Sequence, residues 1–167
     1  HMKGTGGMPV PAERPPRGYY GVGIEGGKYS VNMGSLWRIA QSFHADFVIT
    51  IGARYPMKRV RTDTSDALKH VPMFEFPTVE AFLAARSPRC RLVAIELLPT
   101  ATPLSAYTHP ERAIYLLGAE DRGVSDELLA QCDEQVVVEG GRFCCNVAVT
   151  AAIVLWHRIQ QQGVIYG

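Results

Sequence analysis

The most restrictive feature of this sequence is that short, continuously apolar runs alternate with segments of helical periodicity. In half-exposed strands, apolar and polar residues alternate. Continuous apolar runs are instead typical of strands buried on both faces. Strands are predicted at 19–24, 47–51, 92–98, 113–117 and 136–138, and helices at 32–44, 78–86, 125–132 and 146–162. This alternation predicts an α/β fold, a mostly parallel sheet covered by helices on both faces.

Residues that favour helix ends stand at several of these boundaries. Ser30 or Asn32 is expected to cap the first helix, and Thr78 and Ser125 the next two. Gly163 is placed to end the longest helix, 146–162. The segment 53–77 is polar, and its apolar residues follow neither the helical nor the strand spacing. We therefore expect it to be irregular.

The charge balance excludes a uniformly basic nucleic-acid binder. The 167 residues include 17 Lys and Arg against 16 Asp and Glu, a net charge of +1. Any nucleic-acid site must therefore be a local patch. The best candidate is the segment 54–69, and the alternative is a solvated loop. The basic residues of this segment that we predict to contact RNA are Arg54, Lys58, Arg59 and Arg61.

Cysteine use and hydropathy narrow the class further. The four cysteines have no C-x-x-C spacing and the five histidines no metal-ligand spacing, so no disulfide framework and no metal are expected. A reducing cytoplasm fits this pattern. No apolar run approaches the roughly 18 residues of a membrane span. Residues 1–17 are rich in glycine and proline and are predicted to be a disordered tail. His1 before Met2 is interpreted as a cloning remnant, and 18–167 as one domain.

Residues 21–26, GVGIEG, match the dinucleotide-binding pattern G-x-G-x-x-G. That fingerprint needs a strand before the first glycine and a helix opening at the third. Here only Tyr19 and Tyr20 lead into it, and the helical pattern begins some six residues after Gly26. We therefore interpret the segment as a glycine-rich edge strand and turn.

Three other segments form a specific set. They are 32–40 (NMGSLWRIA), 113–124 (AIYLLGAEDRGV) and 136–149 (VVVEGGRFCCNVAV). In order and spacing they resemble the motifs of the SpoU family of RNA ribose 2′-O-methyltransferases, within the SPOUT superfamily. The family patterns are N-x-G-x-x-x-R-x-A, a strand running into G-x-E-x-x-G, and I-P-M-x-G-x-x-x-S-L-N-V. The resemblance extends over residues 19–162.

The chain departs from the family pattern in the third motif. The Ile-Pro-Met of the family is Val136–Val138 here, and its Ser-Leu-Asn is Cys144-Cys145-Asn146. Cys144 replaces a strong hydrogen-bond donor by a weak one. We interpret Cys144 as a small residue lining a loop rather than as a nucleophile, because nothing in the sequence identifies a base positioned beside it.

The resemblance implies a C-terminal trefoil knot, which ordinary chain-connection rules would nearly exclude. It further implies a homodimer that binds S-adenosylmethionine and methylates a ribose in tRNA or rRNA. The implied cofactor-binding residues lie in three loops: Ile95, Glu96, Leu97, Leu117, Gly118, Ala119, Glu120, Val136, Val138, Phe143, Cys144, Cys145 and Asn146.

The resemblance also assigns catalytic roles to Arg38, Asn32 and Glu120. Arg38 is expected to orient the RNA phosphate and the 2′-hydroxyl, because a guanidinium with a pKa above about 12 is a poor base. Asn32 is expected to hold Arg38 or the ribose, or only to cap its helix. Glu120 is expected to position Arg38 or Asn32, or to be a solvated loop carboxylate. Asn146 is expected to close the cofactor loop and cap the last helix.

The changes at Val137 and Cys144 leave a second hypothesis open: a catalytically inactive, knotted RNA-binding or assembly protein. The joint presence of Asn32, Arg38, Glu120 and Asn146 argues against it, since a pure binding protein needs no such set.

Overall fold

The computed structural model describes residues 18–58, 60, 70–141 and 146–163. Within these residues lies one sheet of seven strands in the order β3-β2-β1-β6-β4-β7-β5. Every pair of neighbouring strands is parallel. The strands are β1 (Tyr19–Glu25), β2 (Phe47–Ile51), β3 (Met73–Phe76), β4 (Arg91–Ile95), β5 (Thr102–Pro103), β6 (Arg112–Gly118) and β7 (Glu134–Val137). The predicted parallel α/β sheet is confirmed.

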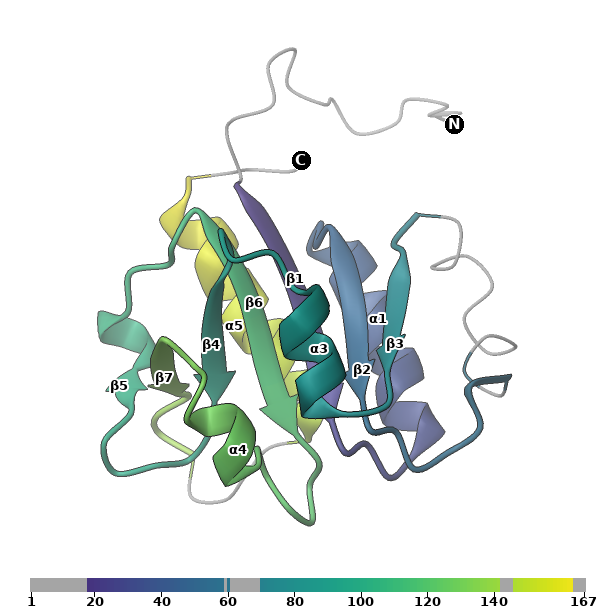
Figure 1. The fold of residues 1–167 in the computed structure, drawn as a ribbon. Helices are drawn as coiled ribbons and strands as arrows, with labels where there is room; N and C mark the ends of the chain where they lie inside the picture. Colours follow the sequence, from purple (N-terminus) through teal and green to yellow (C-terminus); the bar gives the residue numbers. More distant parts are fainter. Residues whose placement is uncertain (1–17, 59, 61–69, 142–145, 164–167) are drawn as a thin grey trace, which may run out of the picture.

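Helices cover both faces of the sheet, as predicted (Figure 1). They are α1 (Ser30–Ser42), α3 (Val79–Ala85), α4 (Asp126–Leu129) and α5 (Val147–Gln161). On one face α1 and α5 bury Leu36, Trp37 and Leu155 against the sheet. On the other, α3 and α4 bury Phe82 and Leu128. Among the described residues, no helix is both long and apolar enough to cross a membrane.

Three predicted caps are confirmed by hydrogen bonds. The side chain of Thr78 accepts from Ala81 N at 3.1 Å, that of Ser125 from Leu128 N at 3.2 Å, and that of Asn146 from Ala148 N at 2.9 Å. Gly163 follows α5 with φ of +65°, the left-handed conformation that ends many helices.

The predicted cap of α1 is wrong. The N-cap position is Tyr29, which makes no side-chain cap hydrogen bond. Ser30 lies inside the helix, and the Asn32 side chain bonds to distant residues instead, as described below.

Some predicted bounds also differ. The segment 53–77 contains β3, an edge strand whose residues are only half-buried or exposed, which is why it lacks a continuous apolar run. The helix predicted at 125–132 is shorter. Gln131 N and Cys132 N donate to carbonyls three residues back, so its second half is a run of tight turns.

The interpretation of 21–26 as an edge strand is also wrong, because β1 lies between β2 and β6. Gly21 and Gly23 are paired with Phe47 and Ile49. A Cβ on Gly21 would lie 2.1 Å from the Phe47 ring, and one on Gly23 would lie 2.1 Å from Ile49 Cγ1. These glycines admit large side chains of the adjacent strand, so they are a signal of close interior packing.

A buried polar cluster joins α5 to the amino end of β6. Arg158 is fully buried and donates to the carbonyls of Pro110 and Glu111 at 2.7 and 2.8 Å. It also donates to the Tyr115 hydroxyl at 2.9 Å. That hydroxyl lies 2.6 Å from His109 Nδ1. Burial, with the nearby charge of Arg158, lowers the pKa of His109 to about 3.

This low pKa predicts a pH-dependent stability. His109 is neutral in the folded protein, whereas in the unfolded chain it takes up a proton below about pH 6.5. Its contribution to stability is therefore complete above pH 6.5 and is lost as the pH falls toward 3. In urea unfolding, His109→Gln should lose about 1 kcal/mol less between pH 7 and pH 5 than wild type, allowing for solvent screening.

His70→Gln is the matched control, because His70 is exposed. It should keep the wild-type pH dependence. Equal losses in His109→Gln and wild type would contradict this account of the cluster.

Candidate functional site

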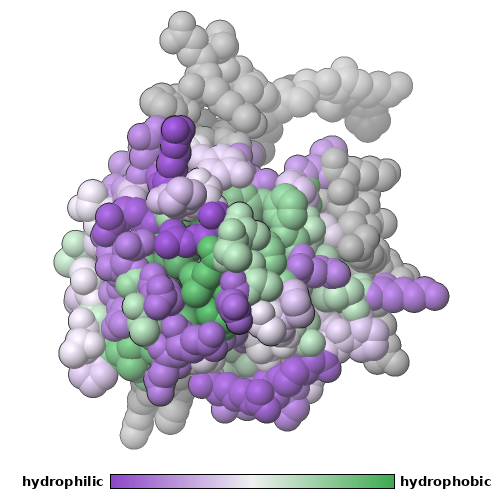
Figure 2. Space-filling view, in the orientation of Figure 1, coloured by the Kyte–Doolittle hydropathy of each residue, from purple (hydrophilic) through white to green (hydrophobic). Residues whose placement is uncertain are grey.

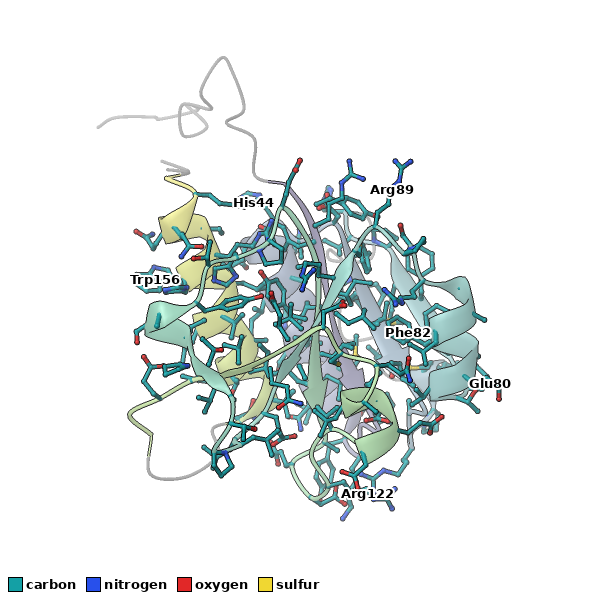
Figure 3. All side chains as sticks on the ribbon, turned by 60° about the vertical axis from the view of Figure 1, so that its left-hand side comes forward. His44, Glu80, Phe82, Arg89, Arg122 and Trp156 are labelled. Atoms are coloured by element: carbon teal, nitrogen blue, oxygen red, sulfur yellow. The ribbon has the colours of Figure 1, made fainter. Side chains whose placement is uncertain are left out.

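A cavity of about 380 Å³ opens at the edge of the sheet where β4, β6 and β7 end. Open parallel sheets bind ligands at the carboxyl ends of their strands. Its walls are the segments that follow these three strands and the first turn of α5. Arg122, which lines it, lies at the lower end of the molecule in Figure 3.

The structure brings most of the predicted cofactor-binding residues to this cavity. Those that line it are Ile95, Glu96, Leu97, Leu117, Gly118, Ala119, Glu120 and Val138. Val136, which is fully buried in β7, and Asn146 do not line it. Phe143, Cys144 and Cys145 lie outside the described residues.

Further lining residues were not anticipated from the sequence: Leu98, Asp121, Arg122, Gly123, Val124, Asp126, Leu129, Val137, Gly141, Val147 and Thr150. Several of them directly follow predicted residues in the sequence. The signal that could have identified them is the length of the turn that follows each strand. The strand predicted at 92–98 ends at Ile95, and the chain then turns along the cavity wall.

Two carboxylates hold the turns around the cavity. Glu96 accepts from Val124 N at 2.7 Å and from Leu97 N at 3.1 Å, which joins the turn after β4 to the turn after β6. Glu25 accepts from the backbone and the hydroxyl of Ser125 at 2.7 and 2.6 Å, fixing the start of α4. The cavity wall is thus fixed by bonds between sheet and loops.

The turn after β6 has no room for a side chain at Gly118. A Cβ there would lie 1.8 Å from the carbonyl carbon of Gly123. Gly123 N donates to Ala119 O at 2.8 Å, which closes the turn. The backbone can therefore approach this closely only with glycine at 118.

Three distant residues meet at the rim of the cavity. Glu120 Oε1 accepts from Asn146 Nδ2 at 3.0 Å and from Asn32 Nδ2 at 3.4 Å. Asn146 Nδ2 also lies 3.2 Å from Asn32 Oδ1 and donates to it. One side chain from each of the three sequence motifs thus forms a hydrogen-bonded group. The Glu120 carboxylate is exposed and retains acceptor capacity for a bound ligand.

A second, smaller cavity of about 200 Å³ lies beside the first. It is lined on one side by Ile24, Gly27, Lys28, Tyr29 and Asn32. The two cavities share the residues Ala119, Glu120, Asp121 and Val147. Ligands in the two cavities would therefore meet at Glu120.

Arg54 donates hydrogen bonds to two of the segments that form this second cavity. Its guanidinium donates to both oxygens of Asp121, at 2.7 and 3.1 Å, and its Nε donates to Gly26 O at 2.8 Å. The hydrogen bond from Arg54 lowers the pKa of the Asp121 carboxyl. The residue thus links the connection before α1 to the turn after β6.

Of the remaining predicted RNA contacts, the structure describes Arg38 and Lys58, and neither lines a cavity. Arg38 is exposed on α1, six residues after Asn32 and so about 240° around the helix and about 9 Å along it. Within the described residues its guanidinium has no hydrogen-bond or ion-pair partner. Lys58 is exposed, and Arg59 and Arg61 lie outside the described residues. In the described part of the chain, no three potential metal ligands cluster.

The sequence model of the SpoU rRNA Methylase family matches residues 22–156, most of the chain. The chain belongs to the SpoU rRNA Methylase family. Its motifs are the ones that converge at Glu120. A comparison with curated protein sequences found no match.

Solved structures share the fold of this SpoU-family chain. One, from a study of the 2-OH methylation of C/U34 on tRNA, has a TM-score of 0.77 and 19% identity, covering 88% of this chain and 98% of the other. An AdoMet-bound rRNA methyltransferase from Sinorhizobium meliloti has a TM-score of 0.76 and 20% identity, covering 87% and 60%. The TrmH/SpoU tRNA modifying enzyme of A. aeolicus has a TM-score of 0.72 and 18% identity, covering 90% and 80%.

The crowding at Gly118 generates a prediction. Gly118→Ala must displace the backbone of the turn, and we expect a loss of about 1–3 kcal/mol in the free energy of unfolding. Gly140→Ala is the control. A Cβ there meets nothing within 4 Å, although its φ of +88° adds some strain. Urea unfolding should give the larger loss for Gly118→Ala, and the opposite order would contradict the packing argument.

Proposed function

We propose that this chain transfers a methyl group from S-adenosylmethionine to a ribose 2′-hydroxyl of tRNA or rRNA. The observation that carries the proposal is the meeting of three family motifs at Glu120, between two cavities that share this carboxylate. The S. meliloti relative has AdoMet bound, and another relative is described with 2-OH methylation of tRNA. Both agree with this assignment.

The larger cavity suits the cofactor. Its volume of about 380 Å³ is within the usual range for small-molecule sites. Leu97, Leu117 and Val138 provide an apolar wall for an adenine ring, and Gly118 brings the backbone close to it. The carboxylates of Glu120 and Asp121 favour a positive charge at the rim. The bound cofactor supplies a methyl group on a sulfonium, so no covalent enzyme intermediate is needed.

The smaller cavity suits the acceptor ribose. A 2′-hydroxyl at its inner wall would lie beside Glu120, whose free acceptor capacity can take a hydrogen bond from the hydroxyl and ease loss of its proton. The amides of Asn32 and Asn146 fix the orientation of this carboxylate. Arg38 remains charged and orients an RNA phosphate over the outer surface of α1. In this proposal Arg54 shapes the acceptor cavity in addition to its predicted RNA contact, and Lys58, Arg59 and Arg61 remain predicted RNA contacts from the sequence.

We further propose that the working unit is a cytoplasmic homodimer of one domain, 18–167, with the trefoil knot of its family. An exposed apolar surface on α1 and α5 supports the dimer. Val31 is 65% exposed, Val149 50% and Trp156 51%, and Trp156 projects outward from α5 in Figure 3. A sedimentation mass near 37 kDa, twice the 18.4 kDa of the chain, is expected. A mass near that of one chain at micromolar concentration would contradict the dimer.

The rival hypothesis, an inactive RNA-binding or assembly protein, gives a different result in calorimetry. The enzyme should bind both S-adenosylmethionine and S-adenosylhomocysteine. Absence of heat and of a thermal shift with either ligand at millimolar concentration would favour the rival hypothesis.

Replacement of Arg38 should separate cofactor binding from catalysis. Arg38→Ala should keep the affinity for S-adenosylhomocysteine within a few-fold, because Arg38 lines neither cavity. It should slow single-turnover methyl transfer at least ~100-fold, since orientation and proton-transfer assistance typically contribute that much. Arg38→Lys should restore little, because lysine lacks the planar fork that binds phosphate with two donors.

The RNA provides the control for the target atom. A substrate with 2′-deoxyribose at the modified nucleotide should accept no methyl group. Methylation of that substrate, or a wild-type rate for Arg38→Ala, would show that the assigned site or target atom is wrong.

A further inference from the structure

Three aromatic rings form a row on the α3 face of the sheet, near the amino ends of the strands. Tyr19 and Phe47 have ring centroids 5.4 Å apart, and Phe47 and Phe74 6.2 Å. The outer two rings are open to solvent, Tyr19 at 47% and Phe74 at 49% exposed, whereas Phe47 is buried between them. In the space-filling view of this face, apolar surface is exposed beside α3 (Figure 2).

The glycine pattern of β1 makes this row possible. Tyr19 and Gly21 lie on the same face of β1, and Gly21 is paired with Phe47. The Phe47 ring occupies the space that a side chain at Gly21 would fill. It therefore lies across β1 and connects the ring of Tyr19 to that of Phe74. The G-x-G segment thus has a structural role in this surface.

Three arginines lie at this end of the molecule, on the β6 and β4 side of Tyr19. Arg112 is paired with Tyr19 and lies on the same face. Arg86 donates to Cys90 O at 3.1 Å, and Arg89 projects from the upper end of the molecule in Figure 3. Within the described residues, none of these three arginines forms an ion pair. Carboxylates also occur in this region: Asp46 accepts from Tyr20 N at 2.9 Å, Asp133 accepts from Leu92 N at 2.8 Å, and Glu111 precedes Arg112 in the sequence.

We propose that this platform, Tyr19, Phe47 and Phe74 with Arg86, Arg89 and Arg112, binds an unpaired stretch of RNA. Exposed rings stack on bases of any sequence, and guanidinium groups that form no ion pair with a carboxylate can bind phosphates. A protein partner would be expected to cover a more continuous apolar area with fewer free charges. That the RNA is the methylation substrate rests on the proposed function.

The platform is separate from the methyl-transfer site. β1 and β6 each run six residue steps from the platform to the cavity edge, about 20 Å at about 3.3 Å per residue. A substrate bound at both places must therefore extend along the α3 face of the sheet. The platform would then add affinity without contacting the reacting ribose.

The test measures binding of a fluorescein-labelled oligouridylate 12-mer by anisotropy, without cofactor. Tyr19→Ala with Phe74→Ala should weaken binding at least ~10-fold, because each base–aromatic stack contributes about 1–3 kcal/mol. Tyr19→Phe, which keeps the ring, should bind as wild type. Arg89→Ala with Arg112→Ala should reduce the slope of log K against log salt by about 1.4, or about 0.7 per phosphate contact.

Arg91→Ala is the matched arginine control. It stands at the same end of the sheet, but is paired with Ala113 on the opposite face and bridges to Glu134 at 3.4 Å. It should leave both affinity and slope unchanged. If the double aromatic variant fails to fold by circular dichroism, a 4-thiouridine 12-mer should crosslink to Tyr19 or Phe74 of the wild type.

Two results would overturn the proposal: wild-type affinity in the folded aromatic variant, or a lower sedimentation mass of that variant, which would show that a second copy covers this face. Failure of methyl transfer with intact 12-mer binding at the platform would overturn the proposed function and leave the platform standing.

Discussion

The hydrogen-bonded group of Asn32, Glu120 and Asn146 is the interaction on which the arrangement of the site depends. These residues come from the start of α1, the turn after β6 and the start of α5. Only a parallel sheet with β1 beside β6 brings the first two together, because both elements follow the carboxyl ends of those strands. The carboxylate is exposed but oriented by two amides. It therefore lies at the boundary of two cavities in a fixed orientation. This arrangement is suited to bringing a methyl donor and a hydroxyl together.

The support around this group comes from charged side chains at or near the ends of strands. Glu25 ends β1 and holds the start of α4, Glu96 follows β4 and holds the turn after β6, and Arg54 holds that turn from outside through Asp121. Each bond joins segments far apart in sequence, so the loops are positioned by the scaffold rather than by their own conformation. The opposite end of the sheet has a different organisation, with the buried Arg158 cluster on one face and an aromatic and arginine surface on the other.

Much of the fold was predictable because its strands are buried on both faces and so have continuous apolar runs. β3 was missed, since an edge strand with exposed residues lacks that signal. The motifs located the loops that line the cavity, because glycine at 118 and polar residues at 32, 120 and 146 keep characteristic spacings, but they identified fewer than half of the lining residues. Sequence alone did not reveal that Arg54 pairs with Asp121, or that Phe47 packs over Gly21. Both contacts join residues whose proximity is set only by strand order, which local patterns do not encode.

We propose that the cavity beside Glu120 holds the methyl donor and the adjoining cavity the acceptor. The most direct test of this proposal is a crystal structure of the protein with S-adenosylhomocysteine. We expect the adenosine against Leu97, Leu117 and Val138, with the sulfur directed toward Glu120 and the smaller cavity left open on the other side of that carboxylate. Ligand density in the smaller cavity, or at a place remote from Gly118 and Glu120, would contradict it.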